Sequence, residues 1–467
     1  MQTNLSKLKF AERSVLLIAG SIFKMLTQII VLIIYARQLS VTDYAIYQSA
    51  WLYINVISVI SLFGLPSIIL SVGVSNIKIW IADNKKIFLF YAALLNLVPI
   101  AYMFLVPNSF SLITILLLLC FTVIQNGSII TESIAVKNDK EKMLFKTNIL
   151  FSIFFLAAHL LILSINYSLQ CLMMALIVVF FVKTILQWYF IGIVPNLETI
   201  SIKNGKQWLF LGLNDIFSVV FKWFDKWIIL YFLTLHEFAI YFNGSYEIPV
   251  FGLMAGAAGN IMLVEYCKPD KDLQIKTKAL FENSATLLSG IVFPSFCFLL
   301  FYRNDFFTFV FSSKYIEAVP IFLISIFILP VRVTSFTAIL QANRRTDIIL
   351  KGAIIDLITA IFLMMVFYPL YKTIGLALAC VVSTYGQAAY YLWQTSKIIK
   401  KSMAYLFPFK KLFTTMTISA IVMAFGYISC KNLFYPLHLV VGIMVSLILI
   451  IFFIYRYYSD SKKEIFY

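Results

Sequence analysis

The stretch that decides the fold runs from Asn214 to Tyr241 and reads NDIFSVVFKWFDKWIILYFLTLHEFAIY. Its end, Leu233–Tyr241 (LTLHEFAIY), matches an earlier stretch, Leu39–Tyr47 (LSVTDYAIY), with four of nine positions identical and four more conservative. A second match, Ile22-Phe23 with Ile216-Phe217, has the same offset of 194 residues. Two matches in one register indicate a duplicated chain.

The composition around this repeat is that of a membrane protein. Of the 467 residues, 62% are hydrophobic and only 12% are charged, and apolar runs near 20 residues recur throughout. These runs predict an all-α polytopic membrane protein. The net charge of +16 does not indicate a nucleic-acid partner, because the basic residues lie between the apolar runs, as in a membrane protein that obeys the positive-inside rule.

The apolar runs predict fourteen transmembrane spans. If both termini are cytoplasmic, 27 of the 37 Lys and Arg residues face the inside and five the outside, which strongly favours this orientation. The predicted spans are residues 14–36, 44–73, 86–106, 110–136, 144–164, 169–193, 207–233, 238–264, 284–302, 316–341, 348–369, 374–396, 411–429 and 437–456.

The repeat divides these spans into two lobes. An offset of six spans is even, so the two copies cross the membrane in the same direction and form a parallel repeat around a central cavity. The predicted parts are an N-lobe (1–193, spans 1–6), a cytoplasmic linker (194–206), a C-lobe (207–400, spans 7–12), and two further spans with a cytoplasmic tail (401–467).

Basic residues deep in the spans are the candidates for a binding site, because charges inside the membrane are costly and usually face a cavity. The deepest are Lys24, Lys222, Lys226 and Arg332. Since Lys24 and Lys222 lie in the first span of each lobe, we expect them to face a common cationic cavity that attracts an anionic head group. The alternatives are snorkelling and local ion pairing. Asp225 is close enough in the helix to neutralise either Lys222 or Lys226.

Four carboxylates lie in the same spans: Asp225, Glu247, Glu132 and Asp356. Each has two interpretations, coupling to a proton or cation and pairing with a basic residue, of which pairing is the commoner. Lys183 lies near the inner end of its span, where snorkelling is expected. The three histidines are unclustered and no catalytic or phosphate-binding motif is present, so the sequence predicts no metal, no cofactor and no catalytic residue.

Several short motifs along the chain match those of a known family. They are Ala36-Arg37-x-Leu39-Ser40, Asp43-Tyr44-Ala45-x-Tyr47, Gly64-Leu65, Asp225-Lys226, Ala239-x-Tyr241, Leu340-Gln341-Ala342-x-Arg344 and Ile374-Gly375-Leu376-Ala377. On these residues the chain resembles the polysaccharide-biosynthesis flippases of the MOP superfamily, of the Wzx type. It departs from that family at Ala45 and Ala239, where glycine is usual, and in using lysine for most of its cations. Lysine binds phosphate as a point charge, without the bidentate geometry of arginine.

The resemblance implies two six-helix lobes with alternating access. The implied substrate is an undecaprenyl-diphosphate-linked oligosaccharide, such as the O-antigen repeat unit of lipopolysaccharide, which moves from the cytoplasmic to the outer leaflet of the bacterial inner membrane. The implied partners, besides the lipid bilayer, are the polymerase and chain-length proteins of the same pathway.

Two other classes of protein are less consistent with the sequence. A MATE-like multidrug extruder would need acidic residues to dominate the deep cavity, and the deep charges here lean basic. A membrane-embedded polysaccharide polymerase would need a carboxylate cluster or a long outer loop. The longest predicted outer loop, Arg303–Ile316, is too short for that role.

Overall fold

The computed structural model describes residues 20, 22–72, 81, 83–105, 110–138, 140–192, 206–267, 272–343, 345–434 and 436–466. The chain divides into two compact units, Met1–Leu230 and Tyr231–Tyr467. The predicted linker lies outside the described residues except for Lys206, and so does Arg344 of the motif at the end of the tenth span.

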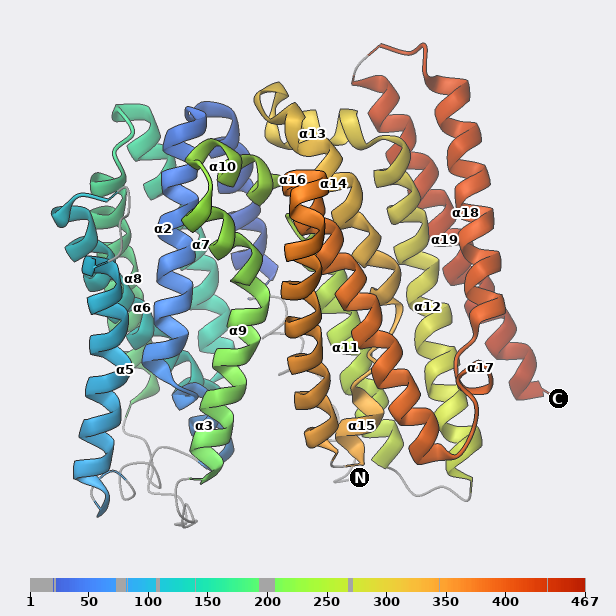
Figure 1. The fold of residues 1–467 in the computed structure, drawn as a ribbon, viewed down its shortest axis with the longest axis horizontal. Coiled ribbons are helices and arrows are strands. Elements are labelled where there is room, and N and C mark those ends of the chain that lie inside the picture. The colour runs from blue at the N-terminus through green and yellow to red at the C-terminus, as the bar shows by residue number, and fades with distance from the viewer. Residues whose placement is uncertain are drawn as a thin grey trace. The chain divides into compact units, whose positions relative to one another are not determined.

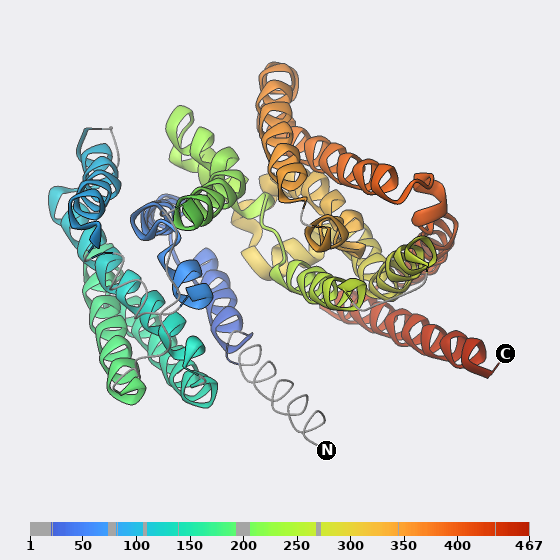
Figure 2. The same ribbon diagram turned by 90° about the horizontal axis from the view of Figure 1, so that it is seen from below.

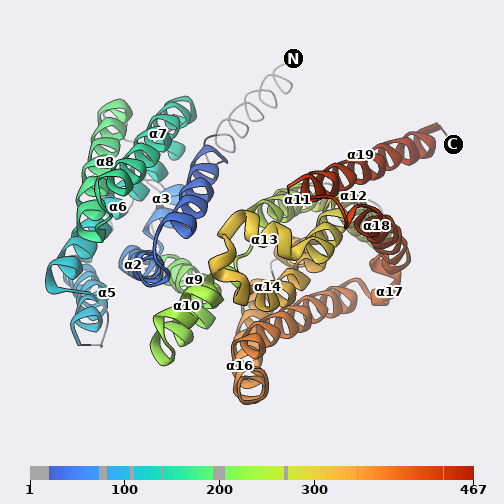
Figure 3. The same ribbon diagram turned by 90° about the horizontal axis from the view of Figure 1, so that it is seen from above.

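The first unit begins with a helical segment, residues 22–38. Its other helices are α2 (Val41–Leu62), α3 (Leu65–Val72), α5 (Lys85–Leu105), α6 (Leu112–Lys137), α7 (Glu141–Ile165), α8 (Leu169–Ile191) and most of α9 (Lys206–Phe232) (Figure 1). Helix α8 packs along both α6 and α7 (Figure 3). The start of α9 is joined to the turn after α2, because the indole nitrogen of Trp208 donates to the carbonyl of Phe63 at 2.9 Å.

The second unit contains the remaining helices. They are α10 (Leu235–Gly244), α11 (Pro249–Cys267), α12 (Leu273–Phe301), α13 (Arg303–Phe311), η2 (Ser313–Ala318), α14 (Val319–Ser325), η3 (Ile326–Val333), α15 (Ala338–Ala342), α16 (Thr346–Ile399), α17 (Met403–Leu406), α18 (Phe409–Cys430) and α19 (Leu437–Phe466). Helix α12 is central to this unit, where it packs against η3, α18 and α19 (Figures 2 and 3).

These helices confirm an all-α polytopic membrane protein. Within the described residues, nine helices are long and apolar enough to cross a membrane, or ten if the bent pair α10–α11 counts as one span. Many large apolar side chains on them are exposed, such as Phe413 and Phe425 of α18, as expected for surfaces that face lipid. Each of the fourteen predicted spans has a helical counterpart. The lobe boundaries stay a prediction, since α9 makes its described contacts within the first unit.

The sequence repeat corresponds to one structural feature, a helix start that occurs twice. Ser40 caps α2 by accepting from the backbone nitrogen of Asp43 at 3.1 Å, and Thr234 caps α10 by accepting from that of Glu237 at 3.2 Å. Both caps have an extended backbone with ψ of 158°. The aromatic and alanine positions that follow, such as Ala45 and Ala239, are buried in both copies. The residues that match between the two copies of the repeat therefore form an N-cap and the buried helix face that follows it.

Three predicted spans are interrupted. The second is divided between α2 and α3 at Phe63 and Gly64, which both have positive φ. The eighth bends by 48° between α10 and α11, where Pro249 begins the second part and supplies no backbone donor. The tenth changes from α-helix to the tighter 3₁₀ form in η3, which contains Pro330.

The other turns explain two motif glycines. Gly64 has a left-handed φ of 71° between α2 and α3, where a side chain would be strained. Lys372, with φ 52°, breaks α16 into two limbs that match the eleventh and twelfth spans. A Cβ on Gly375, just after this break, would lie 2.3 Å from the carbonyl oxygen of Phe367, so the turn admits no larger residue.

Candidate substrate-binding site

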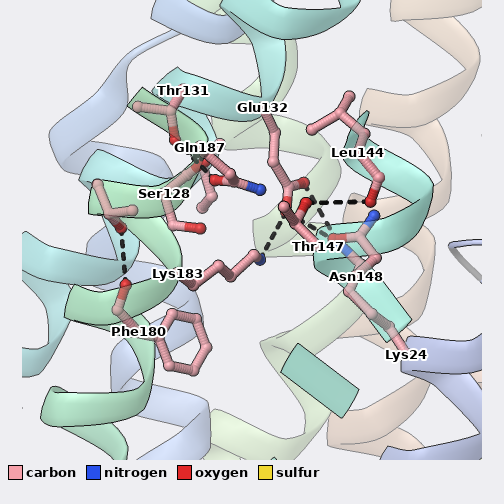
Figure 4. Close-up of polar contacts among 12 residues, drawn as sticks. Lys24, Ser128, Thr131, Glu132, Leu144, Thr147, Asn148, Phe180, Lys183 and Gln187 are labelled. Carbon is pink, nitrogen blue, oxygen red and sulfur yellow. Dashed lines mark hydrogen bonds and ion pairs between the residues drawn. The ribbon is translucent and has the colours of Figure 1, made fainter. Parts of the chain in front are cut away.

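An ion cluster of three side chains lies among the helices of the first unit (Figure 4). Glu132 of α6 is contacted by Lys24, from the segment 22–38, and by Lys183 of α8. The Lys24 ammonium donates to Oε1 and Oε2 of Glu132 at 3.1 and 3.2 Å, and the Lys183 ammonium donates to Oε1 at 2.6 Å. We call these three residues the Glu132 cluster. Lys24 and Glu132 are 108 positions apart in the chain, and Glu132 and Lys183 are 51 positions apart.

Helix packing holds this cluster in place. Thr131, next to Glu132 on α6, donates to the amide oxygen of Gln187 on α8 at 2.9 Å. Lys183 lies one turn before Gln187 on the same face, and its ammonium is 4.3 Å from the centre of the Phe151 ring on α7. A cation over an aromatic face gains electrostatic stabilisation. Three helices therefore fix the Lys183 ammonium beside the carboxylate.

The Glu132 cluster carries one positive charge in excess, since two ammonium groups share one carboxylate. The side chain of Lys183 is only 6% exposed, and those of Lys24 and Glu132 are 25% and 26% exposed. Charges in such surroundings are poorly solvated, so an uncompensated positive charge attracts anions strongly.

Polar atoms without partners surround the cluster. The amide oxygen of Asn148, the amide nitrogen of Gln187 and the hydroxyl of Ser128 are buried and have no hydrogen-bond partner among the described residues. Figure 4 places all three residues around Glu132 and its lysines. Buried polar groups are normally satisfied, so these atoms need water or a polar ligand. The arrangement can bind an anion and hydrogen-bond to a polar group beside it.

The candidates of α9 form a separate pair. Asp225 could neutralise either Lys222 or Lys226 by its spacing, and in the structure its carboxylate forms an ion pair with the Lys226 ammonium at 3.2 Å. Lys222 is exposed, with its ammonium 5.3 Å from the centre of the Trp223 ring. The predicted cavity role of both lysines stays a prediction.

Two of the three candidates in the second unit lie at its interrupted spans. Arg332, at the end of η3, donates through Nε and Nη2 to Oε1 of Glu247 at 3.0 and 2.5 Å. Glu247 lies in the break between α10 and α11, so this pair links two irregular segments. Asp356 of α16 is half-buried, and its Oδ1 has no hydrogen-bond partner among the residues the structure describes. Pairing thus accounts for Glu247, Glu132 and Asp225, whereas no ion pair is described for Asp356.

The prediction for Lys183 was wrong. It does not snorkel, because its side chain is buried and its ammonium contacts Glu132. The signal that could have identified it is the helical spacing of Phe180, Lys183 and Gln187, which share one buried face of α8. The amides Gln187 and Asn148 were also missed, because their role depends on which helices pack together.

Comparisons with known proteins identify the fold of the chain. No family model and no curated protein matches the sequence. Among solved structures, lipid II flippase MurJ in an inward closed conformation is similar, with 15% identity and a TM-score of 0.66 over 96% of this chain and 99% of MurJ.

Two further structures are similar at 13% identity. A MOP superfamily transporter from Pyrococcus furiosus has a TM-score of 0.58 over 84% of this chain and 96% of its own. A multidrug resistance MATE family transporter in an inward-facing conformation has a TM-score of 0.59 over 81% and 95%. The chain therefore has the fold of the membrane transporters of the MOP superfamily.

Proposed function

We propose that this protein is a flippase, not an enzyme, for undecaprenyl-diphosphate-linked oligosaccharide, an O-antigen repeat unit or a similar glycan. It moves this substrate from the cytoplasmic to the outer leaflet of the bacterial inner membrane by alternating access. The observation that carries the proposal is the Glu132 cluster, which holds an excess positive charge in the interior of a transporter fold.

The cluster suits a diphosphate for a geometric reason. Lys24 and Lys183 already converge on one carboxylate, so their ammonium groups are spaced to hold an anion between them. A diphosphate carries more charge than a carboxylate and has more acceptor oxygens, so it competes with Glu132 for these donors. The buried polar atoms of Asn148 and Gln187 are then available to the sugar next to the diphosphate.

The other basic candidates take secondary roles in this proposal. Lys222, exposed on α9, adds positive charge along the substrate path. Lys226 and Arg332 are each paired with a carboxylate, so they bind substrate only if those pairs open. We assign Asp356, for which no ion pair is described, no substrate contact.

The balance of charge argues against a multidrug extruder. A site for cationic drugs needs an excess of carboxylates, whereas the Glu132 cluster has two lysines for one acid. Similarity to a MATE transporter extends to the fold, and it leaves the sign of the substrate's charge to be decided by the side chains.

The proposal includes an orientation in the membrane. The excess of basic residues in alternate loops supports cytoplasmic termini, and the repeat at an offset of 194 residues supports two lobes of six spans each. The substrate then enters from the side of the basic loops, with its lipid tail remaining in the bilayer and its diphosphate reaching the Glu132 cluster.

Charge reversal at Lys24 tests the function. In the native cell, Lys24→Glu should abolish surface glycan and leave lipid-linked intermediates on the cytoplasmic face, because two carboxylates then face one lysine. Lys24→Arg should retain surface glycan, and Lys431→Glu, at an exposed position after α18, should have no effect. Immunoblots of membranes confirm equal protein. Unchanged surface glycan in Lys24→Glu would remove Lys24 from the site.

A further inference from the structure

A second basic site lies in the other unit, where the ends of three helices meet. Residues 397–411 contain five lysines and no carboxylate. They include the end of α16, the short helix α17 and the start of α18. The first turns of α12 add Lys278 beside them. We call Lys278, Lys397, Lys401 and Tyr405 the α12–α17 basic surface.

This surface is held rigidly. Leu406 of α17 is fully buried, and the Phe407 ring next to it lies 6.1 Å from that of Phe281 and 5.5 Å from that of Phe336. The side chain of Gln274 on α12 donates to the carbonyl of Ile399 at 3.3 Å, which joins the start of α12 to the end of α16. The positions of the lysines are therefore set by packed neighbours.

Two of the lysines share one aromatic ring. The ammonium of Lys278 is 5.0 Å from the centre of the Tyr405 ring and that of Lys401 is 5.3 Å from it, so the two nitrogens are at most about 10 Å apart. The ammonium of Lys397 lies 3.5 Å from the centre of the Trp393 ring. In the described part of the chain, the contacts of these three lysines are with rings and not with carboxylates.

The nearby carboxylates that the structure describes are already engaged. Glu282 forms an ion pair with Lys411, and Asp272 accepts from two backbone nitrogens at the start of α12. Lys278 and Lys401 therefore present positive charge that no described carboxylate neutralises, and an anion from outside the chain can bind there.

The surroundings indicate where that anion comes from. Exposed apolar side chains flank the basic surface, among them Met403, Phe409 and Trp393. Lysines next to exposed aromatic and apolar groups at the ends of transmembrane helices lie at the level of the lipid head groups. The positive-inside rule assigns this face to the cytoplasmic leaflet, which is rich in anionic lipid.

We propose that the α12–α17 basic surface binds the phosphate of an anionic phospholipid, with Lys278 and Lys401 as the cations on either side of it. Tyr405 keeps the two lysines in place when no lipid is bound. The site lies in the second unit and is distinct from the Glu132 cluster, so it does not depend on the proposed transport function.

Lipid retention by the purified full-length protein tests this proposal. Native mass spectrometry in detergent, with phosphatidylglycerol or phosphatidylcholine added at equal concentration, counts the lipids bound. We expect preferential retention of phosphatidylglycerol. Lys278→Gln/Lys401→Gln should weaken it about twenty-fivefold, since each basic residue near an anionic head group contributes about fivefold. Lys278→Arg/Lys401→Arg should retain the lipid.

A matched control is available at the other ends of the same helices. Lys372→Gln/Lys431→Gln removes two exposed lysines at the break of α16 and after α18, and it should leave retention unchanged. Equal retention of phosphatidylglycerol by the Lys278/Lys401 glutamine variant and the wild type would overturn the proposal. So would displacement of the lipid by inorganic phosphate at the same concentration, which would make the site one for free phosphate.

Discussion

Glu132 is the residue on which the interior charge of the first unit depends. One of its oxygens accepts from two lysines, so losing either lysine leaves a neutral pair, whereas losing the carboxylate leaves two cations without a partner. The cost of burying charge is far higher for unpaired charges than for a pair. The three residues of the Glu132 cluster are therefore unequal in their importance for stability.

This inequality is measurable. We expect Glu132→Gln to lower the free energy of unfolding by about 3 kcal/mol and Lys24→Gln by only about 1 kcal/mol. Thermal unfolding of the two purified variants in the same detergent makes the comparison, with Lys431→Gln as the control for loss of an exposed charge. A larger loss for Lys24→Gln than for Glu132→Gln would contradict the shared-carboxylate arrangement.

At this scale the sequence revealed which residues were unusual but not which ones meet. Lys24 and Glu132 stood out as charges inside apolar runs, and pairing was the expected outcome for Glu132. Their contact across 108 positions depends on how helices pack, which has no local signal. Lys183 was misjudged because its depth along the helix was considered and its buried face was not.

At the scale of elements, the repeated helix start shows how one methylene group changes a cap. Glu237 reaches back to the backbone nitrogen of Thr234 at 3.0 Å and completes a capping box. Asp43, the equivalent residue, is shorter and contacts the Ser40 hydroxyl instead, at 2.6 Å. The second copy therefore satisfies two backbone donors where the first satisfies one.

Removing this cap should have a local cost. Thr234→Ala is expected to lower the free energy of unfolding by about 1 kcal/mol, because the backbone nitrogen of Glu237 loses its acceptor, the Thr234 hydroxyl. Thermal unfolding of the purified protein measures the change. Thr414→Ala is the matched control, since its hydroxyl only donates to a carbonyl one turn earlier on an exposed helix face. Equal losses in the two variants would mean that the cap contributes nothing specific.

Most elements could be predicted because apolar runs and turn residues are local signals. Pro330 lies where the tenth span takes the 3₁₀ form, and proline is a residue that commonly interrupts an α-helix. The bend before Pro249 was missed, although Asn243, Gly244 and Pro249 are typical turn residues that interrupt the apolar run of residues 238–264. The 3₁₀ form of η3 was also beyond prediction, because its hydrogen bonds depend on neighbouring helices; the Tyr385 hydroxyl, for example, donates to the Phe327 carbonyl at 2.9 Å.

At the scale of the whole molecule, the direction of transport and the charge of the substrate are linked. When the cytoplasmic side of the membrane is negative, outward movement of a diphosphate is favoured by about 2.3 kcal/mol of free energy per negative charge per 100 mV. The excess positive charge of the Glu132 cluster stabilises the negatively charged diphosphate while it crosses the membrane. We therefore propose that the membrane potential drives flipping without a separate coupling ion.

An imposed potential tests this consequence. In proteoliposomes without an ion gradient, we expect flipping of the lipid-linked oligosaccharide to be faster with the potential negative on the entry side and slower when its sign is reversed. Liposomes without protein give the background rate. A rate that is independent of the sign of the potential would rule out the potential as the driving force.

The last helix has a mechanical consequence. Of the 30 residues of α19, Leu437–Tyr457 are apolar enough to cross the bilayer, and the helix continues to Phe466. At 1.5 Å per residue, the final nine residues form a stalk of about 13 Å. A reporter domain fused to the C-terminus would therefore be raised clear of the lipid surface, with room to fold and to be reached by an antibody.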